Sequence, residues 1–220
     1  MRPNEATMEA PKPTLAAVLE KENLNRAWEA VRANKGAPGP DGRDIASSQA
    51  HMRENWENIE AKLRSGEYNP GPVRAVTIPK PNGGERTLGV PNVQDRLIQQ
   101  AIHAKLSKRC EPFFSEHSYG FRPMRSAHDA VCAAQEFIKQ GKRYVVDIDL
   151  KSFFDEVSHD KFMYLLDKHV EDKSLKKLIG AILRAPVQRP DGSRYKRGKG
   201  TPQGGPLSPL LAIPPNRFIP

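Results

Sequence analysis

A short apolar run that carries two aspartates constrains the fold of this 220-residue chain more than any other feature. It reads Tyr-Val-Val-Asp-Ile-Asp-Leu over residues 144–150, and its β-branched and apolar side chains favour a buried β-strand. Because side chains two positions apart share a face of a strand, Asp147 and Asp149 are expected to point the same way. Burying two carboxylates is costly unless a cation neutralises them, and Mg²⁺ prefers oxygen ligands. The run therefore predicts a metal site, although an exposed strand end or a capped turn explains an isolated Asp-x-Asp equally well.

The rest of the chain reads as helices followed by antiparallel strands and further helices. Apolar spacing and the positions of Gly, Pro and Asn predict helices over 15–34, 45–65, 93–111, 126–140, 159–169 and 172–184. Residues 73–91 read as two strands around a turn at 82–84, and a second hairpin is expected around Pro190. The fold class is therefore α+β, behind a disordered tail at residues 1–13.

Charge and composition narrow the class of protein further. The formal net charge is +9, and the excess of Lys and Arg begins at about Val73, which favours a polyanionic partner for the later two-thirds of the chain. No apolar run reaches the roughly 18 residues that would span a bilayer, and the N-terminus lacks the apolar region of a signal peptide. Cys110 and Cys132 have no metal-ligand spacing. We therefore expect a cytoplasmic protein without a membrane partner.

Five sequence blocks in order identify a family resemblance. They are NKGAPGPDG (34–42), IPKPNGGERTLGVPNVQDRLIQQAI (78–102), SYGFRP (118–123), DLKSFFDEVSHDKFM (149–163) and GTPQGGPLSPLLA (200–212). Together they resemble the reverse transcriptases, or RNA-directed DNA polymerases, that group II introns encode along with a maturase role. A nucleotide-sugar transferase could also use Asp147-x-Asp149, but it leaves the TPQGGPLSP and SYGFRP blocks unexplained.

The resemblance implies a right-hand polymerase with fingers and a partial palm. It divides the chain into a helical N-terminal extension or fingers segment at 14–70, fingers at 71–142 and a partial palm at 143–212. The implied reaction is two-metal nucleotidyl transfer with Mg²⁺, extending a DNA 3′ end on an RNA template. The implied partners are intron RNA or another RNA template, a DNA primer or target, and deoxynucleoside triphosphates.

The resemblance also assigns the residues of the metal and sugar sites. Asp149 is the implied catalytic metal ligand, assisted by the carbonyl of Leu150, whereas Asp147 and Asp155 are expected to have structural roles. Phe154 falls where a bulky ring would clash with a ribose 2′-OH and so select deoxynucleotides. We assign its neighbour Phe153 to core packing, which is also the plainer explanation of both rings.

The remaining assignments concern phosphates and bases. Lys80 and Arg86 are implied to bind the nucleotide triphosphate, although a solvated charged hairpin would carry the same residues. In the TPQGGPLSP block, Gln203 is implied to contact the nucleotide, and Gly204 to let the backbone approach the nascent base pair. Arg122 of SYGFRP either contacts the template backbone or braces the fingers.

Two further arginines, Arg74 and Arg96, are weaker candidates than Lys80 and Arg86 for the triphosphate. We expect them to contact the nucleic-acid backbone or to form salt bridges.

The C-terminal residues depart from the family pattern. Residues 213–220 contain three prolines, which cannot continue the helix expected after PLLA, and Tyr-x-Asp-Asp, the implied second source of metal carboxylates, does not occur. We interpret this as a chain truncated or frameshifted before the thumb, with an aberrant tail and little or no polymerase activity of its own. A non-catalytic basic RNA-binding remnant or splicing cofactor is the alternative function.

Overall fold

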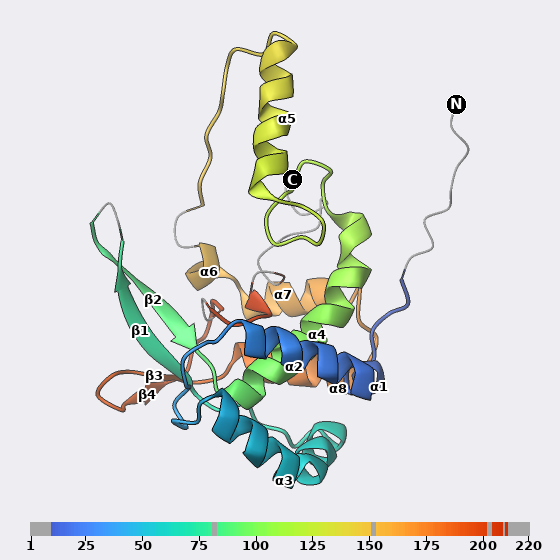
Figure 1. Cartoon of the computed structure of the whole chain (residues 1–220), viewed down its shortest axis with the longest axis vertical. Helices are drawn as coiled ribbons and strands as arrows, with labels where there is room; N and C mark the ends of the chain where they lie inside the picture. Colours follow the sequence, from blue (N-terminus) through green and yellow to red (C-terminus); the bar gives the residue numbers. More distant parts are fainter. Residues whose placement is uncertain (1–9, 81–82, 151–152, 202–203, 209, 211–220) are drawn as a thin grey trace.

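The computed structural model describes residues 10–80, 83–150, 153–201, 204–208 and 210, and within them it shows an α+β chain (Figure 1). The strands are few and short compared with the helices. In chain order the elements are α1 (Leu15–Val18), α2 (Lys21–Ala33), α3 (Ile45–Ser65), β1 (Val73–Pro79), β2 (Glu85–Val90), α4 (Val93–Cys110), the 3₁₀-helix η1 (Glu111–Phe113), α5 (Ala127–Lys139), α6 (Phe153–Glu156), α7 (His159–Leu166), α8 (Lys173–Leu183), β3 (Val187–Gln188) and β4 (Arg194–Tyr195).

Helix α4 lies at the centre of the body and organises the core. It contacts α1, α2 and α3, and Figure 1 shows it crossing the middle of the molecule. Its apolar residues Ile98, Ala101, Ile102 and Leu106 are almost fully buried in a cluster that also includes side chains of α3 and α8. Because α4 is covered on several sides, it carries apolar residues around much of its circumference rather than along one stripe.

The predicted helix over 15–34 is wrong in one respect, since the chain forms two helices there. Helix α1 ends at Val18, and α2 begins at Lys21. The buried Asn23 side chain donates to the carbonyl of Val18 at 2.8 Å and to that of Ala101 at 3.1 Å, which satisfies the end of α1 and ties it to α4. Apolar spacing alone continues across such a break, because both helices bury their apolar residues against the same core.

Other helix boundaries match the prediction, and capping explains them. Helix α3 ends at Gly66, which has a left-handed conformation with φ of +73°. Helix α5 begins after Ser126, where the Ser126 and Asp129 side chains form a reciprocal capping box.

The sheet is small and mixed, with strand order β2-β1-β3-β4. Strands β1 and β2 form the predicted antiparallel hairpin, with Arg74 opposite Val90 and Ile78 opposite Arg86. The second predicted hairpin is also antiparallel, β3 with β4, and the sheet adds a parallel pairing that was not predicted, between β1 and β3 through Val73 and Val187. The parallel pair is possible because α4 through α8 carry the chain from β2 to the opposite edge of β1 before β3 begins.

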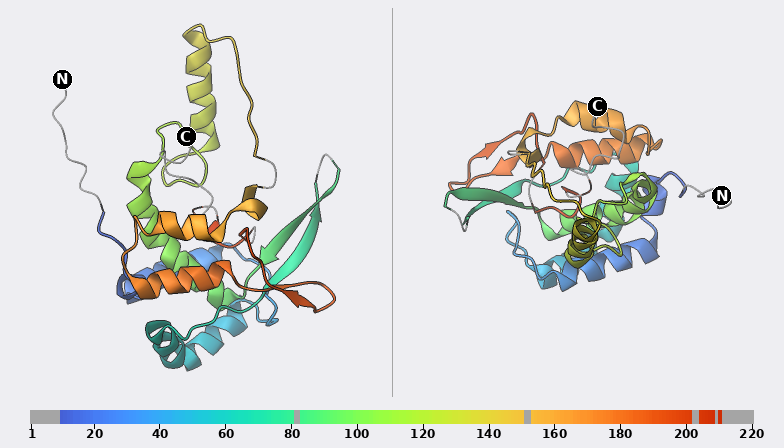
Figure 2. Two further views of the ribbon diagram at one scale, coloured as in Figure 1. Left: turned by 180° about the vertical axis from the view of Figure 1, so that it is seen from behind. Right: turned by 90° about the horizontal axis from the view of Figure 1, so that it is seen from above.

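The segment 144–150 is not a buried strand, so this prediction is wrong. Its residues pair with no strand of the described chain, and Tyr144, Val145, Val146 and Ile148 are 80–97% exposed. Figures 1 and 2 show why: α5 and the segment that follows it project away from the body as an arm, with no strand of the described chain beside them. β-branched composition favours extended backbone, but a strand also requires a neighbour that satisfies its hydrogen bonds.

None of the helices in the described part of the chain combines the length and the apolar character needed to cross a membrane.

Candidate active site

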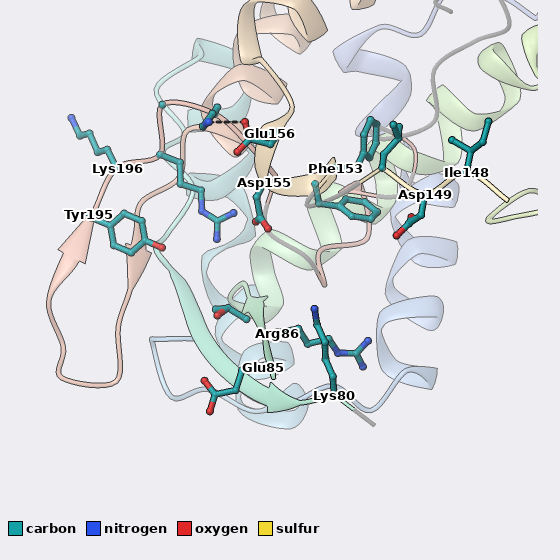
Figure 3. Close-up of a pocket in the computed structure, with 16 residues that line it drawn as sticks. Lys80, Glu85, Arg86, Ile148, Asp149, Phe153, Asp155, Glu156, Tyr195 and Lys196 are labelled. Atoms are coloured by element: carbon teal, nitrogen blue, oxygen red, sulfur yellow. Dashed lines mark hydrogen bonds and ion pairs between the residues drawn. The ribbon is translucent and has the colours of Figure 1, made fainter. Parts of the chain in front are cut away.

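A cleft of about 1,110 Å³ contains most of the predicted site residues (Figure 3). Three segments that are far apart in the sequence form its walls. The first is the β1–β2 hairpin with Lys80, Glu85, Arg86 and Thr87; the second is the end of the exposed run and α6 with Ile148, Asp149, Leu150, Phe153, Phe154, Asp155 and Glu156; the third follows β3 and comprises Tyr195, Lys196, Arg197, Gly198 and Lys199. The cleft is open and bears both signs of charge.

The structure separates the two aspartates of the opening motif. Asp149 lines the cleft together with Leu150, whereas Asp147 does not line it. In the described residues, no group of three or more His, Cys, Asp or Glu side chains is arranged to hold a metal ion. One carboxylate and a neighbouring carbonyl in an open cleft nevertheless suit Mg²⁺, which takes one or two carboxylates and completes its shell with water and substrate phosphates.

Asp155 also lines the cleft, and its carboxylate is exposed. The structural hydrogen bond expected of it is not formed with any residue that the structure describes, and the adjacent residues 151–152 lie outside that set. Its structural role therefore stays a prediction.

Phe153 and Phe154 occupy the second wall side by side. Their rings meet edge to face, with centroids 5.8 Å apart, and both are half-buried. Phe154 is fixed from behind because its carbonyl accepts a hydrogen bond from the amide of Thr201 at 2.7 Å. Phe153 is not part of the buried core to which we assigned it, since it lines the cleft.

Lys80 and Arg86 lie at the hairpin end of the cleft, and Figure 3 shows both side chains on the side facing Phe153 and Asp149. The hairpin places them together because Arg86 pairs across the strands with Ile78, two residues before Lys80. Both cations are exposed, and neither forms an ion pair with a described residue. They are therefore free to bind an anion in the cleft.

Gly204 of the TPQGGPLSP block contacts the β1–β2 hairpin. Gly204 has φ of +118°, and a Cβ added there would lie 2.9 Å from the carbonyl oxygen of Gly89 in β2. This close approach gives a physical reason for glycine at position 204, independent of any base pair. Gln203, the predicted nucleotide contact, lies outside the described residues.

Arg122 braces the loop between η1 and α5, at residues 114–126, rather than presenting its charge to solvent. Its side chain is only 5% exposed and forms an ion pair with Glu111 at 2.6 Å. The same guanidinium donates to the carbonyls of Ser115 and Ser118 and stacks over Phe114 at 5.3 Å. Of the two predicted roles the structure favours the brace, because the guanidinium is buried and four of its five N–H donors are bonded to Glu111, Ser115 and Ser118.

Arg74 and Arg96 lie near each other, and neither lines the cleft. Arg96 is buried and donates to the carbonyl of Ala37, which ties the 34–42 loop to α4. Neither forms the predicted salt bridge within the described chain. Burial lowers the pKa of Arg96, and the neighbouring Arg74 acts in the same direction.

A buried network at the base of the hairpin was not predicted from the sequence. Asp95 is 4% exposed and accepts hydrogen bonds from the Tyr68 hydroxyl at 2.7 Å and from the Gly71 amide at 3.1 Å. Burial raises the pKa of Asp95 to about 6 and raises that of Tyr68 as well. No sequence signal separates this aspartate from the many charged residues on helix surfaces.

The third wall of the cleft, residues 195–199, was also missed. Its signal was available, because Arg-Tyr-Lys-Arg-Gly-Lys over residues 194–199 lies one residue before the TPQGGPLSP block. We placed these residues only in the second hairpin and in the loop that follows it.

A carboxylate opposite unpaired cations in an open cleft is typical of proteins that hold phosphate-bearing ligands with a metal ion. The chain belongs to the family "Reverse transcriptase (RNA-dependent DNA polymerase)", whose model matches residues 78–213. The match includes every wall of the cleft, and it confirms the family resemblance drawn from the five blocks.

The curated relatives of the chain include a protein encoded by a group II intron. It is 37% identical over 188 residues to the group II intron-encoded protein LtrA of Lactococcus lactis, covering 84% of this chain and 31% of that protein. It is 34% identical over 204 residues to protein YkfC of Escherichia coli, covering 90% of this chain and 53% of that protein. The chain therefore spans about a third to a half of these relatives.

Solved structures support the fold. A chain of a partial Cas6-RT-Cas1–Cas2 complex superposes with a TM-score of 0.60 over 90% of this chain and 33% of its own length. At 22% sequence identity, this likeness concerns the fold alone.

Proposed function

We propose that this chain holds a deoxynucleoside triphosphate against an RNA template, as part of the RNA-directed DNA polymerase and maturase of a group II intron. The observation that carries the proposal is the cleft itself, in which Lys80 and Arg86 of one hairpin lie across from Asp149 and Phe154. The family membership and the intron-encoded relatives support the same function.

Each wall has a defined task in this proposal. The ammonium of Lys80 and the forked guanidinium of Arg86 bind the phosphate oxygens and orient the nucleotide. Asp149 and the Leu150 carbonyl would hold Mg²⁺, which when bound supplies positive charge to the reacting phosphate. The ring of Phe154 packs under the sugar and leaves no room for a 2′-OH. DNA primer and template RNA, including intron RNA in the cytoplasm, are the proposed macromolecular partners.

The alternative is a basic RNA-binding protein or splicing cofactor without nucleotide chemistry. One observation favours it: in the part of the chain that the structure describes, no group of three or more His, Cys, Asp or Glu side chains is arranged to hold a metal. The two functions differ in their ligands, since the alternative requires RNA binding but no nucleotide binding.

Nucleotide binding by the 220-residue chain tests the proposal. Titration with a fluorescent deoxynucleoside triphosphate and Mg²⁺ is expected to show saturable binding, and Lys80→Ala/Arg86→Ala weakens it about tenfold or more because two charge-assisted contacts are lost. The control Lys173→Ala/Lys177→Ala removes the same charge from α8, outside the cleft, and leaves the affinity unchanged. RNA binding without nucleotide binding in the wild type would support the alternative function instead.

A further inference from the structure

The third wall of the cleft carries cations that the proposed function does not use. Tyr195, Lys196, Arg197 and Lys199 lie at and after the end of β4 and line the cleft opposite the β1–β2 hairpin. Lys199 forms an ion pair with Glu156 at 2.6 Å. Lys196 and Arg197 pair with no carboxylate of the described chain, although Glu85, Asp149 and Asp155 line the same cleft.

Arg197 is the more unusual of the two because it is half-buried. A guanidinium that has lost part of its hydration and has no carboxylate partner is poised to bind an incoming anion. The Lys199–Glu156 pair and the backbone pairing between Ser158 and Lys199 hold the loop against α6 and α7, so Arg197 stays at the cleft.

One nucleotide triphosphate does not reach both the hairpin cations, Lys80 and Arg86, and Lys196 on the third wall. Figure 3 shows the Lys196 side chain directed away from Lys80 and Arg86, toward the outer rim of the cleft. A ligand that touches the hairpin and Lys196 must therefore pass over the rim. This arrangement favours an extended polyanion.

An aromatic ring next to the cations points to the kind of polyanion. Tyr195 lines the cleft, is 39% exposed, and is held by the guanidinium of Arg189, which lies 4.5 Å from the ring centroid. Proteins that bind single-stranded nucleic acid combine cations along the backbone with aromatic rings on which bases stack. Tyr195, Lys196 and Arg197 provide both in three consecutive residues.

We propose that Tyr195, Lys196 and Arg197 form a contact site for a single-stranded RNA segment that enters or leaves the cleft. Lys196 and Arg197 bind phosphodiester oxygens, and Tyr195 stacks on a base. The inference rests on the proposed function for the identity of the polymer, but it assigns residues and a ligand that the nucleotide site does not include.

Binding of a fluorescein-labelled single-stranded RNA, followed by anisotropy at several salt concentrations, tests the site. Lys196→Ala/Arg197→Ala is expected to weaken binding roughly tenfold at low salt and to reduce the slope of log K against log salt by about 1.4, because each lost phosphate contact removes about 0.7. Tyr195→Ala weakens binding about fivefold or more with an unchanged slope, and Tyr195→Phe retains the affinity.

Matched controls separate this inference from the proposed function. Lys173→Ala/Lys177→Ala has the same charge change and is expected to leave both RNA affinity and slope as in the wild type. Lys196→Ala/Arg197→Ala is also expected to leave nucleotide binding intact, whereas Lys80→Ala/Arg86→Ala weakens it. If nucleotide binding fails in the wild type but the RNA effects hold, the RNA site stands without the polymerase function. An unchanged RNA slope in Lys196→Ala/Arg197→Ala, or loss of nucleotide rather than RNA affinity, would overturn the inference.

Discussion

At the scale of single residues, the buried Asp95 shows how environment decides the role of a charged side chain. Its carboxylate accepts hydrogen bonds from the Tyr68 hydroxyl and the Gly71 amide. Both residues lie in the connection between α3 and β1. The network therefore fixes the root of the hairpin that carries Lys80 and Arg86. Its cost appears in the pKa of Asp95, which burial raises to about 6 from an ordinary value of 3.8.

This pKa predicts a pH dependence of stability. Between pH 4 and pH 6 the folded state keeps the Asp95 proton while the unfolded state has lost it, so raising the pH lowers the free energy of unfolding by about 3 kcal/mol in total. Asp95→Asn removes this titration. Denaturant unfolding from pH 4 to pH 7 should show the wild type losing stability relative to the variant, and a difference that stays constant with pH would contradict the assignment.

Phe154 predicts the sugar preference of the cleft. Phe154→Ala removes the ring that would meet a 2′-OH, so the ratio of deoxynucleotide to ribonucleotide affinity should fall by about tenfold or more. Phe153→Ala is the matched control, because it removes the neighbouring ring of the same cleft and should leave the ratio unchanged. Competition titrations measure both ratios. Equal effects of the two variants would show that neither ring is a specific gate.

At the scale of elements, helix caps and turns were predictable from the sequence, whereas contacts between segments far apart in the sequence were not. The end of α3 at Gly66, the start of α5 after Ser126 and the antiparallel β1–β2 hairpin follow from local chemistry. The break between α1 and α2 depends on a hydrogen bond from Asn23 to distant Ala101, and the exposure of 144–150 depends on the absence of a neighbouring strand in the described chain. Local sequence patterns predict neither the hydrogen bond between distant residues nor which strands become neighbours.

Gly66 offers a test at this scale. Gly66→Ala places a Cβ on a residue with φ of +73° and near the Lys177 side chain, and it should lower the free energy of unfolding by about 1 kcal/mol. Gly120→Ala is the control, because Gly120 has no positive φ and no neighbour within 4 Å of an added Cβ. Thermal unfolding of both variants gives the comparison. A Gly66 variant as stable as the control would refute the capping role.

At the scale of the whole molecule, only some of the site residues predicted from the five sequence blocks line one common cleft. Residues 80, 86, 149 and 154 line it together, as the family resemblance implies, whereas Arg122 braces a loop elsewhere and Asp147 lies outside the lining. The resemblance could indicate which residue types matter, but not which charges the fold buries. The net charge of +9 likewise indicated a polyanion without locating the basic wall at 195–199.

The central proposal is that Asp149 holds a divalent metal and that the cleft binds the nucleotide, and metal-directed cleavage tests it most directly. Fe²⁺ replacing Mg²⁺, with a deoxynucleoside triphosphate, reduces added hydrogen peroxide to hydroxyl radicals that cut the backbone beside the metal, and ascorbate returns the Fe³⁺ to Fe²⁺. We predict cuts near residues 147–150 and in the β1–β2 hairpin, lost in Asp149→Asn but retained in Asp147→Asn, whose carboxylate does not line the cleft. Cuts elsewhere, or the same cuts in Asp149→Asn, would contradict the account.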